Sequence, residues 1–229
     1  MDVPVNGLPD RAVKVRRSAG ANYDPTIDVA FICTGNICRS PMAEVLLRAR
    51  LATVAPDVVV GSAGALFDGR PAERNAVRAV ARQGIDLSGH RSQIMSLELL
   101  EGASVVIGME RRHVVAVADL SADLFARTFT LPELIRSIDV VGLRPDGMDL
   151  GTWVERAGSL RTLDGYGLPD PSSEIADPMG GTARAFRACA DAVDGLLATF
   201  VSLAWPTPEP RDPVVAPTTG GIHADRDRR

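Results

Sequence analysis

Two of the three cysteines in this chain stand close together in the stretch FICTGNICRSPMAE, residues 31–44. Cys33 ends a short apolar run, and Cys38 is followed at once by Arg39. Such a pair could form a disulfide, half of a metal site, core packing, or a nucleophile with an anion-binding loop. Zinc would need a Cys-x-x-Cys pair and more ligands than three scattered histidines supply, so we expect no metal. Buried free cysteines are common, which keeps core packing open.

The residues between and after the two cysteines, here called the cysteine loop (33–40), are of types that curl a chain around an anion. Gly35 and Asn36 tolerate the positive φ angles that such a curl needs. Ser40 as a capping side chain, followed by Pro41 at the first helical position, is typical of a helix start. Backbone N–H groups in such a loop, backed by the helix dipole, bind anions, and Arg39 can add a bidentate fork to two oxygens. A Walker-type loop is excluded because its Gly-Lys-Ser/Thr is absent.

The position of Cys33 suits a nucleophile. A cysteine beside a helix N-terminus and an arginine is favoured as the thiolate, and the Ser40 hydroxyl can donate a hydrogen bond to its sulfur. A thiolate beneath a bound phosphate attacks in line and accepts the phosphoryl group. Cys38 is not needed for that step. It either fills the loop or traps oxidised Cys33 as a disulfide, and both readings stay open.

Short apolar runs alternate along the chain with helix-like patterns. The runs that predict strands are residues 28–34, 57–64, 104–109 and 126–131. Helices are expected after Ser40 and at residues 73–83, 97–101, 111–120 and 182–204. This alternation is typical of a parallel sheet with helices on both faces. We expect one α/β domain with a four-stranded parallel sheet and the phosphate-binding loop after the first strand, at the sheet edge where ligands bind.

Two helices have an inward face that can be read from the sequence. In the helix after the cysteine loop, this face consists of Met42, Val45, Leu46, Ala49 and Thr53. In the last helix it consists of Phe186, Ala190, Val193, Leu197, Phe200 and Val201.

Length and composition indicate the extent of the folded domain and the nature of the two chain ends. With 229 residues, 45% of them hydrophobic, the chain suits one domain, expected at 26–205. Residues 1–25 lack periodicity, so we expect a poorly ordered arm without a secretory signal. Residues 206–229 place five prolines in their first twelve positions, which predicts a disordered tail or docking segment.

Charge and cysteine content argue against several partners. A net charge of −4 argues against nucleic-acid binding, and no apolar run reaches the ~18 residues of a membrane span. Three cysteines are too few for a disulfide framework, so a cytoplasmic location is expected.

FICTGNICRSPMAE resembles the signature of the low-molecular-weight protein tyrosine phosphatases and of the arsenate reductases that share their fold. The later blocks GSAG (61–64), GIDLSGHRSQ (84–93), VVIGMERRHV and LPELIR (131–136) also look like that family, so the resemblance covers roughly residues 27–204. It implies a phosphatase that hydrolyses phosphotyrosine in a protein substrate through phosphocysteine on Cys33, without a cofactor. It further implies that Arg39 binds phosphate and that His90 is structural. The substrate-binding residues that it implies are Thr34, Gly35, Asn36, Ile37, Cys38, Ser40 and Phe67.

The family takes its general acid from an Asp-Pro pair before the last helix. Two such pairs occur here, beginning at Asp170 and at Asp177. Asp177 precedes Phe186 by nine residues, a register similar to the family's, so we expect Asp177 to be the acid and Asp170 a turn residue. The family often has aromatic residues after this pair, whereas this chain has Met179 and Gly180.

Other features near the expected site are less specific. Leu66 and Phe67 fall where the family places a residue beside the phenyl ring, although ordinary packing is an equal alternative. Segment 137–176 is longer than in compact relatives and is interpreted as a lid or docking element. Within it, Trp153 and Tyr166 are expected to pack rather than bind ligand.

Two alternative functions remain. An arsenate reductase of the same fold needs only Cys33 if a small-molecule thiol is the reductant, while Cys189 is expected to be a packing residue. A catalytically silent phosphoprotein-binding module is the alternative from another class.

Overall fold

The computed structural model describes residues 26–159, 161–163, 166, 168 and 170–206, so the expectations for the N-terminal arm and the tail after 206 lie outside it. The expected α/β fold with one four-stranded parallel sheet is confirmed, in the order β2-β1-β3-β4. The strands are β1 (Val29–Cys33), β2 (Val60–Gly64), β3 (Val105–Gly108) and β4 (Thr128–Thr130).

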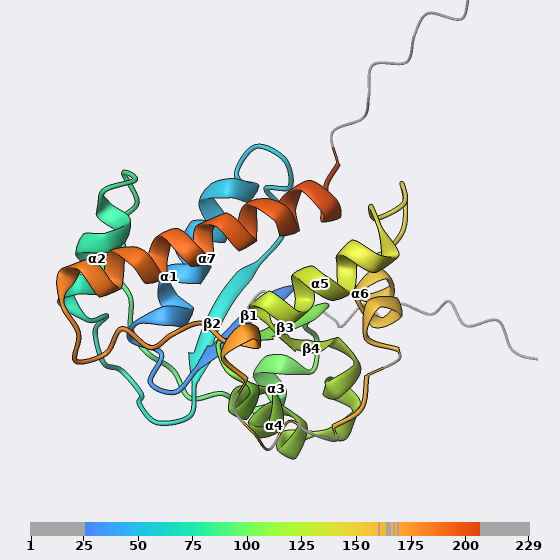
Figure 1. The fold of residues 1–229 in the computed structure, drawn as a ribbon, viewed down its shortest axis with the longest axis horizontal. Coiled ribbons are helices and arrows are strands. Elements are labelled where there is room, and N and C mark those ends of the chain that lie inside the picture. The colour runs from blue at the N-terminus through green and yellow to red at the C-terminus, as the bar shows by residue number, and fades with distance from the viewer. Residues whose placement is uncertain (1–25, 160, 164–165, 167, 169, 207–229) are drawn as a thin grey trace, which may run out of the picture.

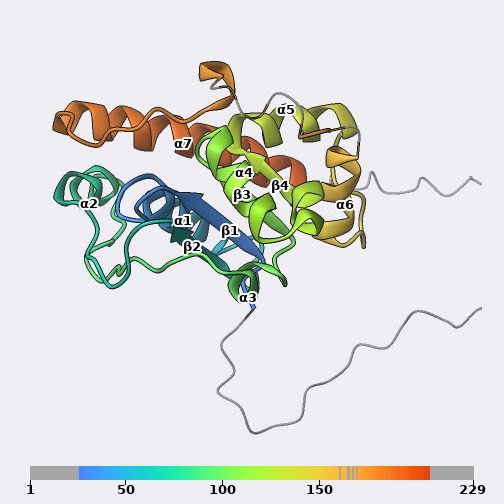
Figure 2. The same cartoon turned by 90° about the horizontal axis from the view of Figure 1, so that it is seen from below.

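Helices cover both faces of this sheet (Figures 1 and 2). One layer contains α1 (Arg39–Leu51), α2 (Arg74–Ala81), α5 (Leu131–Val141) and α7 (Ala183–Ala204). The other contains α3 (Leu97–Leu100), α4 (Arg111–Leu120) and the 3-10 helix η1 (Ala122–Arg127). Among the described residues, no helix has the length and apolarity needed to cross a bilayer.

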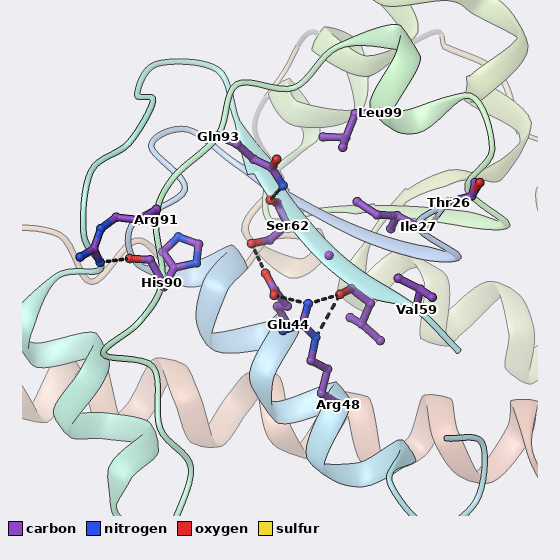
Figure 3. A pocket seen from close by; sticks show the side chains of 12 residues that line it. Thr26, Ile27, Glu44, Arg48, Val59, Ser62, His90, Arg91, Gln93 and Leu99 are labelled. Carbon is purple, nitrogen blue, oxygen red and sulfur yellow. Dashed lines mark hydrogen bonds and ion pairs between the residues drawn. The ribbon is translucent and has the colours of Figure 1, made fainter. Parts of the chain in front are cut away.

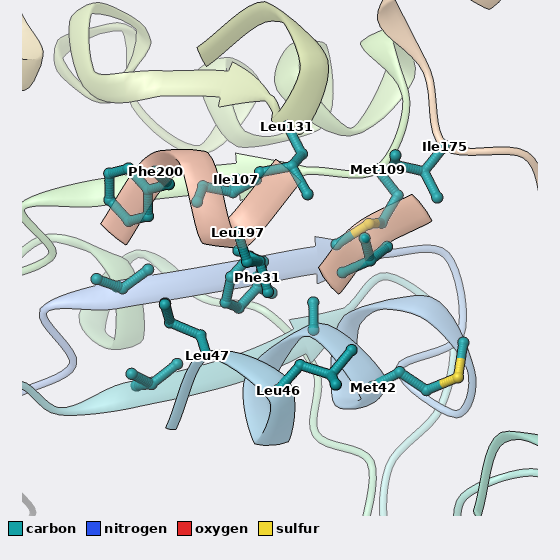
Figure 4. Close-up of a cluster of buried hydrophobic side chains, with 14 of the residues drawn as sticks. Phe31, Met42, Leu46, Leu47, Ile107, Met109, Leu131, Ile175, Leu197 and Phe200 are labelled. Atoms are coloured by element: carbon teal, nitrogen blue, oxygen red, sulfur yellow. The ribbon is translucent and has the colours of Figure 1, made fainter. Parts of the chain in front are cut away.

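Side chains of β1 alternate between the two layers because successive residues of a strand point to opposite faces. Phe31 and Cys33 belong to the larger core cluster, and Ile32 belongs to the smaller one under α3 and α4. Phe31, Leu46 of α1 and Leu197 of α7 belong to the same buried cluster (Figure 4). All five residues of β1 are buried, as expected for a central parallel strand.

The start of α1 differs from the sequence prediction. Ser40 does not cap this helix, because its hydroxyl donates to the Sγ of Cys33, 3.1 Å away. The helix begins at Arg39, and Cys38 takes the N-cap position without a side-chain cap. Pro41 is tolerated as the third helical residue, since the first N–H groups of a helix have no intrahelical partner to lose.

The predicted inward face of α1 was wrong at its C-terminal end. Ala49 and Thr53 are exposed, and the helix ends before Thr53. Buried positions are taken instead by Ala43, Leu47 and Leu51. In α7, by contrast, the expected face is buried throughout except for Val201, which is half-buried.

Segment 137–176 contains the end of α5, then α6 (Leu150–Gly158) and the 3-10 helix η2 (Pro171–Ser173). The sequence analysis did not assign α5, although Thr130 and Glu133 form a capping box at its start. Helix α6 packs against α5 and η1 on the β4 side of the sheet. Trp153 is buried there, with its indole N–H donating to the Gly142 carbonyl at 3.2 Å. This part of the segment therefore braces the sheet.

Arginine side chains donate hydrogen bonds to backbone carbonyl groups on both outer strands of the sheet. The Arg48 guanidinium donates two hydrogen bonds to the carbonyl of Val60 on β2, at 3.1 and 2.6 Å. The Arg161 guanidinium donates to the carbonyl of Thr128 on β4, at 2.6 Å. These bonds satisfy backbone acceptors on strands that have a neighbouring strand on one side only.

Gly158 allows α6 to cross η1, because a Cβ at this position would lie 2.1 Å from the carbonyl oxygen of Ala126. We expect Gly158→Ala to lower the free energy of unfolding by ~1–3 kcal/mol. Gly195 in α7 is the control, since a Cβ there meets nothing within 4 Å and Gly195→Ala should raise it by ~0.5–1 kcal/mol. Urea unfolding measures both. Wild-type stability for Gly158→Ala would contradict this close crossing.

Candidate active site

The cysteine loop connects β1 to α1 at the carboxyl end of the sheet, between β2 and β3. Asn36 has φ 50°, so the left-handed turn expected in the loop falls on this residue. Gly35 is needed for a different reason. A Cβ there would lie 3.1 Å from the ring of Phe67, which packs against the loop.

The Sγ of Cys33 accepts two hydrogen bonds inside the loop. The Asn36 backbone N–H donates at 3.2 Å and the Ser40 hydroxyl at 3.1 Å. Cys33 is only 3% exposed, so few waters compete with these donors. Hydrogen bonds donated to a sulfur favour its negatively charged form.

A cavity of about 450 Å³, here called the thiol cavity, opens over Cys33. The expected site residues that line it are Cys33, Thr34, Gly35, Ile37, Cys38, Arg39, Phe67 and Asp177. Asn36 and Ser40 are fully buried and are not among the lining residues. Leu66 and Met179 line the cavity and are 60% and 48% exposed, so they give it an apolar rim. None of the described residues of segment 137–176 lines the cavity, so a lid role for that part of the segment has no support from the geometry.

Arg39 is a buried cation, 1% exposed, held by two carboxylates and a carbonyl. Its Nη1 donates to the Glu110 carboxylate and, at 3.0 Å, to the carbonyl of Ile175. Its Nη2 donates to Oδ2 of Asp177 at 2.7 Å. Within the described residues, nothing accepts from Nε, so Nε and the second Nη2 hydrogen can face an anion in the thiol cavity.

Glu110 is a site residue that was not predicted from the sequence. It follows β3, whose neighbour is β1, so it arrives beside the cysteine loop. Burial alone would raise the pKa of Glu110, but hydrogen bonds from Arg39 and the Arg39 charge outweigh it, and the pKa lies below its usual value. An acidic residue directly after a buried parallel strand is the signal that could have revealed it.

His113 links Glu110 to the cysteine loop. Its Nδ1 accepts from the Glu110 backbone N–H at 3.1 Å, which leaves Nε2 as the donor to the Thr34 hydroxyl at 3.0 Å. Burial lowers the pKa of His113 to about 4. The ring is therefore neutral at neutral pH, with its tautomer set by these two contacts.

Asn36 holds the loop from beneath. Its side-chain amide donates to Ser40 at 2.9 Å and to Ser62 at 2.8 Å, and its Oδ1 accepts from the Gln93 backbone N–H at 3.0 Å. The His90 ring donates from Nε2 to the Asn36 carbonyl at 2.7 Å. This contact is consistent with the structural role expected for His90.

The two Asp-Pro pairs lie in different surroundings. Asp177 lines the thiol cavity, and its Oδ1 accepts from the Met179 backbone N–H at 3.0 Å. Asp170 caps η2 and pairs with Arg111 at 3.2 Å, outside the residues that line the cavity. Hydrogen bonds from Ser172, with others from the same turn, lower the pKa of Asp170 to about 2.

Cys38 and Cys189 are buried thiols. Burial, with the negative charge of Cys33, raises the pKa of Cys38 to about 12, so Cys38 stays protonated at neutral pH. Burial likewise raises the pKa of Cys189, on α7, to about 12. Tyr166 is also buried, and its hydroxyl contacts Glu133 and Arg161 instead of the cavity.

Comparisons with known proteins agree on one family. The sequence model of the low molecular weight phosphotyrosine protein phosphatase family matches residues 28–140. The low molecular weight protein-tyrosine-phosphatase Etp of Escherichia coli (strain K12) is 31% identical over 113 residues, 49% of this chain and 74% of Etp. A protein-arginine-phosphatase of Bacillus subtilis (strain 168) is 32% identical over 138 residues, 60% of this chain and 91% of that protein. A crystal structure of the low molecular weight protein tyrosine phosphatase from T. tengcongensis superposes with a TM-score of 0.58 and 26% identity, covering 77% of this chain and 98% of the other.

The neutral state of His113 predicts a pH-dependent stability. Below the unfolded-state pKa of ~6.5, the unfolded chain binds a proton at His113 that the folded protein excludes until about pH 4. The contribution of His113 to the free energy of unfolding is ~3 kcal/mol. It is fully present above pH ~6.5 and is lost as the pH falls toward 4. His113→Gln keeps a donor and an acceptor but cannot titrate. Urea unfolding between pH 7 and 4 should show the wild type losing more stability than this variant, and parallel losses would contradict the assignment.

Proposed function

The chain belongs to the low molecular weight phosphotyrosine protein phosphatase family, and on that basis we propose that it hydrolyses phosphotyrosine in proteins through phosphocysteine on Cys33. The observation that carries the proposal is the Cys33 Sγ, which accepts two hydrogen bonds beneath the thiol cavity and beside Arg39. Stabilised sulfur, open space and a fixed cation are the three requirements of a thiolate nucleophile for a phosphoryl group.

In the first proposed step, Cys33 attacks phosphorus on the side opposite the leaving oxygen. The S–P bond forms as the P–O bond to the tyrosine oxygen breaks. Loop N–H groups and the free Nε and Nη2 hydrogens of Arg39 bind the phosphoryl oxygens, and Asp177 gives its proton to the leaving phenolate.

Asp177 must be protonated for that step, although it accepts a hydrogen bond from Arg39 in the structure. A bound phosphate dianion competes with Asp177 for the Arg39 Nη2, and its charge favours the neutral carboxyl group nearby. The Asp177 side chain is 40% exposed, so it can exchange this partner and take a proton from water. We therefore infer that the binding of substrate itself leads to protonation of Asp177.

In the second proposed step, water attacks the phosphocysteine. Asp177, now a carboxylate, accepts the proton of this water, the S–P bond breaks, and the sulfur leaves as the thiolate. Inorganic phosphate departs and the Asp177–Arg39 contact can form again. This chain's side chains and water supply all of these groups.

The walls of the thiol cavity support an aryl phosphate as substrate. Phe67, Leu66 and Met179 offer apolar surface to a phenyl ring above the phosphate position. Phosphoarginine is the second candidate, because Glu73 also lines the cavity and could accept hydrogen bonds from a guanidinium leaving group. The similarity to a protein-arginine-phosphatase supports the same candidate.

A three-substrate assay tests the proposal. We expect the highest kcat/KM with a phosphotyrosine peptide, lower values with a phosphoarginine peptide, and no reduction of arsenate with glutathione. Cys33→Ser should abolish turnover and still bind phosphate, because the loop N–H groups and Arg39 remain. A higher kcat/KM with the phosphoarginine peptide would identify phosphoarginine, the second candidate, as the substrate. Glutathione-dependent arsenate reduction alone, or phosphate binding without any turnover, would replace the phosphatase by one of the other two functions.

The general acid is tested through the leaving group. Asp177→Asn should reduce phosphotyrosine hydrolysis by about 10²–10⁴-fold, because phenolate is a poor leaving group without a proton. Hydrolysis of an activated nitrophenyl phosphate should fall much less. Asp170→Asn is the matched control and should keep near wild-type rates with both substrates. The reverse pattern would transfer the acid role to Asp170.

A further inference from the structure

A second cavity lies on the outer side of β2, away from the thiol cavity (Figure 3). This edge cavity has a volume of about 410 Å³ and is lined in part by Glu44, Arg48, Ser62 and Gln93. Glu44 comes from α1 and is buried, with 9% of its surface exposed. Its two carboxylate oxygens face different partners, Arg48 at 2.7 Å and the Ser62 hydroxyl at 2.5 Å.

From Glu44, a continuous chain of hydrogen bonds leads to the nucleophile. A carboxylate only accepts, so the single hydrogen of the Ser62 hydroxyl points to Glu44. The Ser62 oxygen is then an acceptor toward the Asn36 amide, at 2.8 Å. The direction of this first bond sets the direction of the next.

In the inner half of the chain the hydrogens point the other way, from Asn36 toward Cys33. Asn36 gives its second amide hydrogen to Ser40 at 2.9 Å, and its orientation is fixed because Oδ1 accepts from the Gln93 N–H. With one lone pair of Ser40 occupied, the Ser40 hydrogen is directed away from Asn36. It reaches the Cys33 Sγ at 3.1 Å, in preference to the Ala63 carbonyl at 3.5 Å.

We propose that Glu44 is a positioning residue for the Cys33 thiolate, acting through Ser62, Asn36 and Ser40. As the acceptor at the outer end, it keeps the Ser62 hydrogen away from Asn36, so Ser62 accepts from the Asn36 amide. Together with the Gln93 N–H, this contact holds the amide nitrogen toward Ser40, whose hydrogen then reaches the sulfur. Asn36 and Ser40 are 0% exposed and Ser62 is 2% exposed, so water cannot replace a misdirected hydrogen. The edge cavity is thereby coupled to the chemistry in the thiol cavity.

Glu44→Gln removes the acceptor for the Ser62 hydrogen with little change in shape. The amide oxygen of the introduced glutamine is held by Arg48, which only donates, so its amide nitrogen faces Ser62. That nitrogen donates where the carboxylate accepted, and the Ser62 hydrogen is forced toward the Asn36 amide hydrogens. The contact between Ser62 and the Asn36 amide becomes unfavourable, which loosens the amide that directs the Ser40 hydrogen to Cys33.

The primary readout is the pH dependence of Cys33 alkylation by iodoacetamide, followed by mass spectrometry. We expect the midpoint in Glu44→Gln to rise by ~0.5–1.5 pH units, the effect of weakening one hydrogen bond to a charged sulfur. Arg48→Met is the matched control, because it alters the same cavity and leaves the carboxylate in place. It should keep the wild-type midpoint.

A double-mutant cycle shows whether Glu44 acts through Ser62. Ser62→Ala should raise the midpoint by itself, and adding Glu44→Gln should then have no further effect. If Glu44→Gln does not fold, Ser62→Ala alone carries the test. An unchanged midpoint in a folded Glu44→Gln or Ser62→Ala variant, or additive shifts in the double variant, would overturn the proposal.

The inference rests on Cys33 as the proposed nucleophile, yet alkylation needs no substrate. A shifted midpoint in a protein without phosphatase activity would support the hydrogen-bond chain and contradict the proposed function. Where turnover is present, kcat/KM of Glu44→Gln should fall ~3–30-fold below the shifted midpoint and approach the wild type above it. A purely structural role would lower stability and leave this pH profile unchanged.

Discussion

A guanidinium that is almost completely buried must be neutralised where it lies, and the site is organised around this constraint. Arg39 begins α1, Glu110 follows β3, and Ile175 and Asp177 belong to the loop before α7. One side chain therefore ties the start of α1 to partners that lie 71, 136 and 138 residues further along the chain. The parallel pairing of β1 with β3 makes the contact possible, because it brings both strand ends to the same edge.

The two carboxylates on Arg39 have different surroundings, which suits different tasks. The Glu110 side chain is 15% exposed and contacts the same Nη1 that donates to the Ile175 carbonyl, so it anchors the cation permanently. The Asp177 side chain is 40% exposed and holds the other nitrogen. An anion entering the thiol cavity can replace Asp177 without disturbing Glu110. In the proposed reaction, the same charge that binds substrate thus also prepares the acid.

The sequence predicted what depends on neighbouring residues and missed what depends on distant partners. The strand before Cys33, the turn at Asn36 and the amphipathic α7 all follow from local residue types, and the structure confirms them. Ser40 was given two roles from the sequence, a helix cap and a donor to the Cys33 sulfur, and only the folded loop shows that the second role excludes the first. Glu44 and Glu110 were missed because their partners lie on other elements. Helix α5 is a different case, since its Thr130–Glu133 capping box was present in the sequence.

The arginines that donate to carbonyls of the two outer strands determine how other polypeptides can approach this fold. A peptide that joined β2 or β4 as an extra strand would have to displace Arg48 from Val60 or Arg161 from Thr128. Recognition by strand addition is therefore disfavoured at both edges, as is edge-to-edge self-association into fibrils. A protein substrate is left to dock through side chains at the carboxyl end of the sheet. In the proposed function, selectivity then depends on the modified residue and its immediate neighbours, and pairing with an extended substrate backbone contributes little.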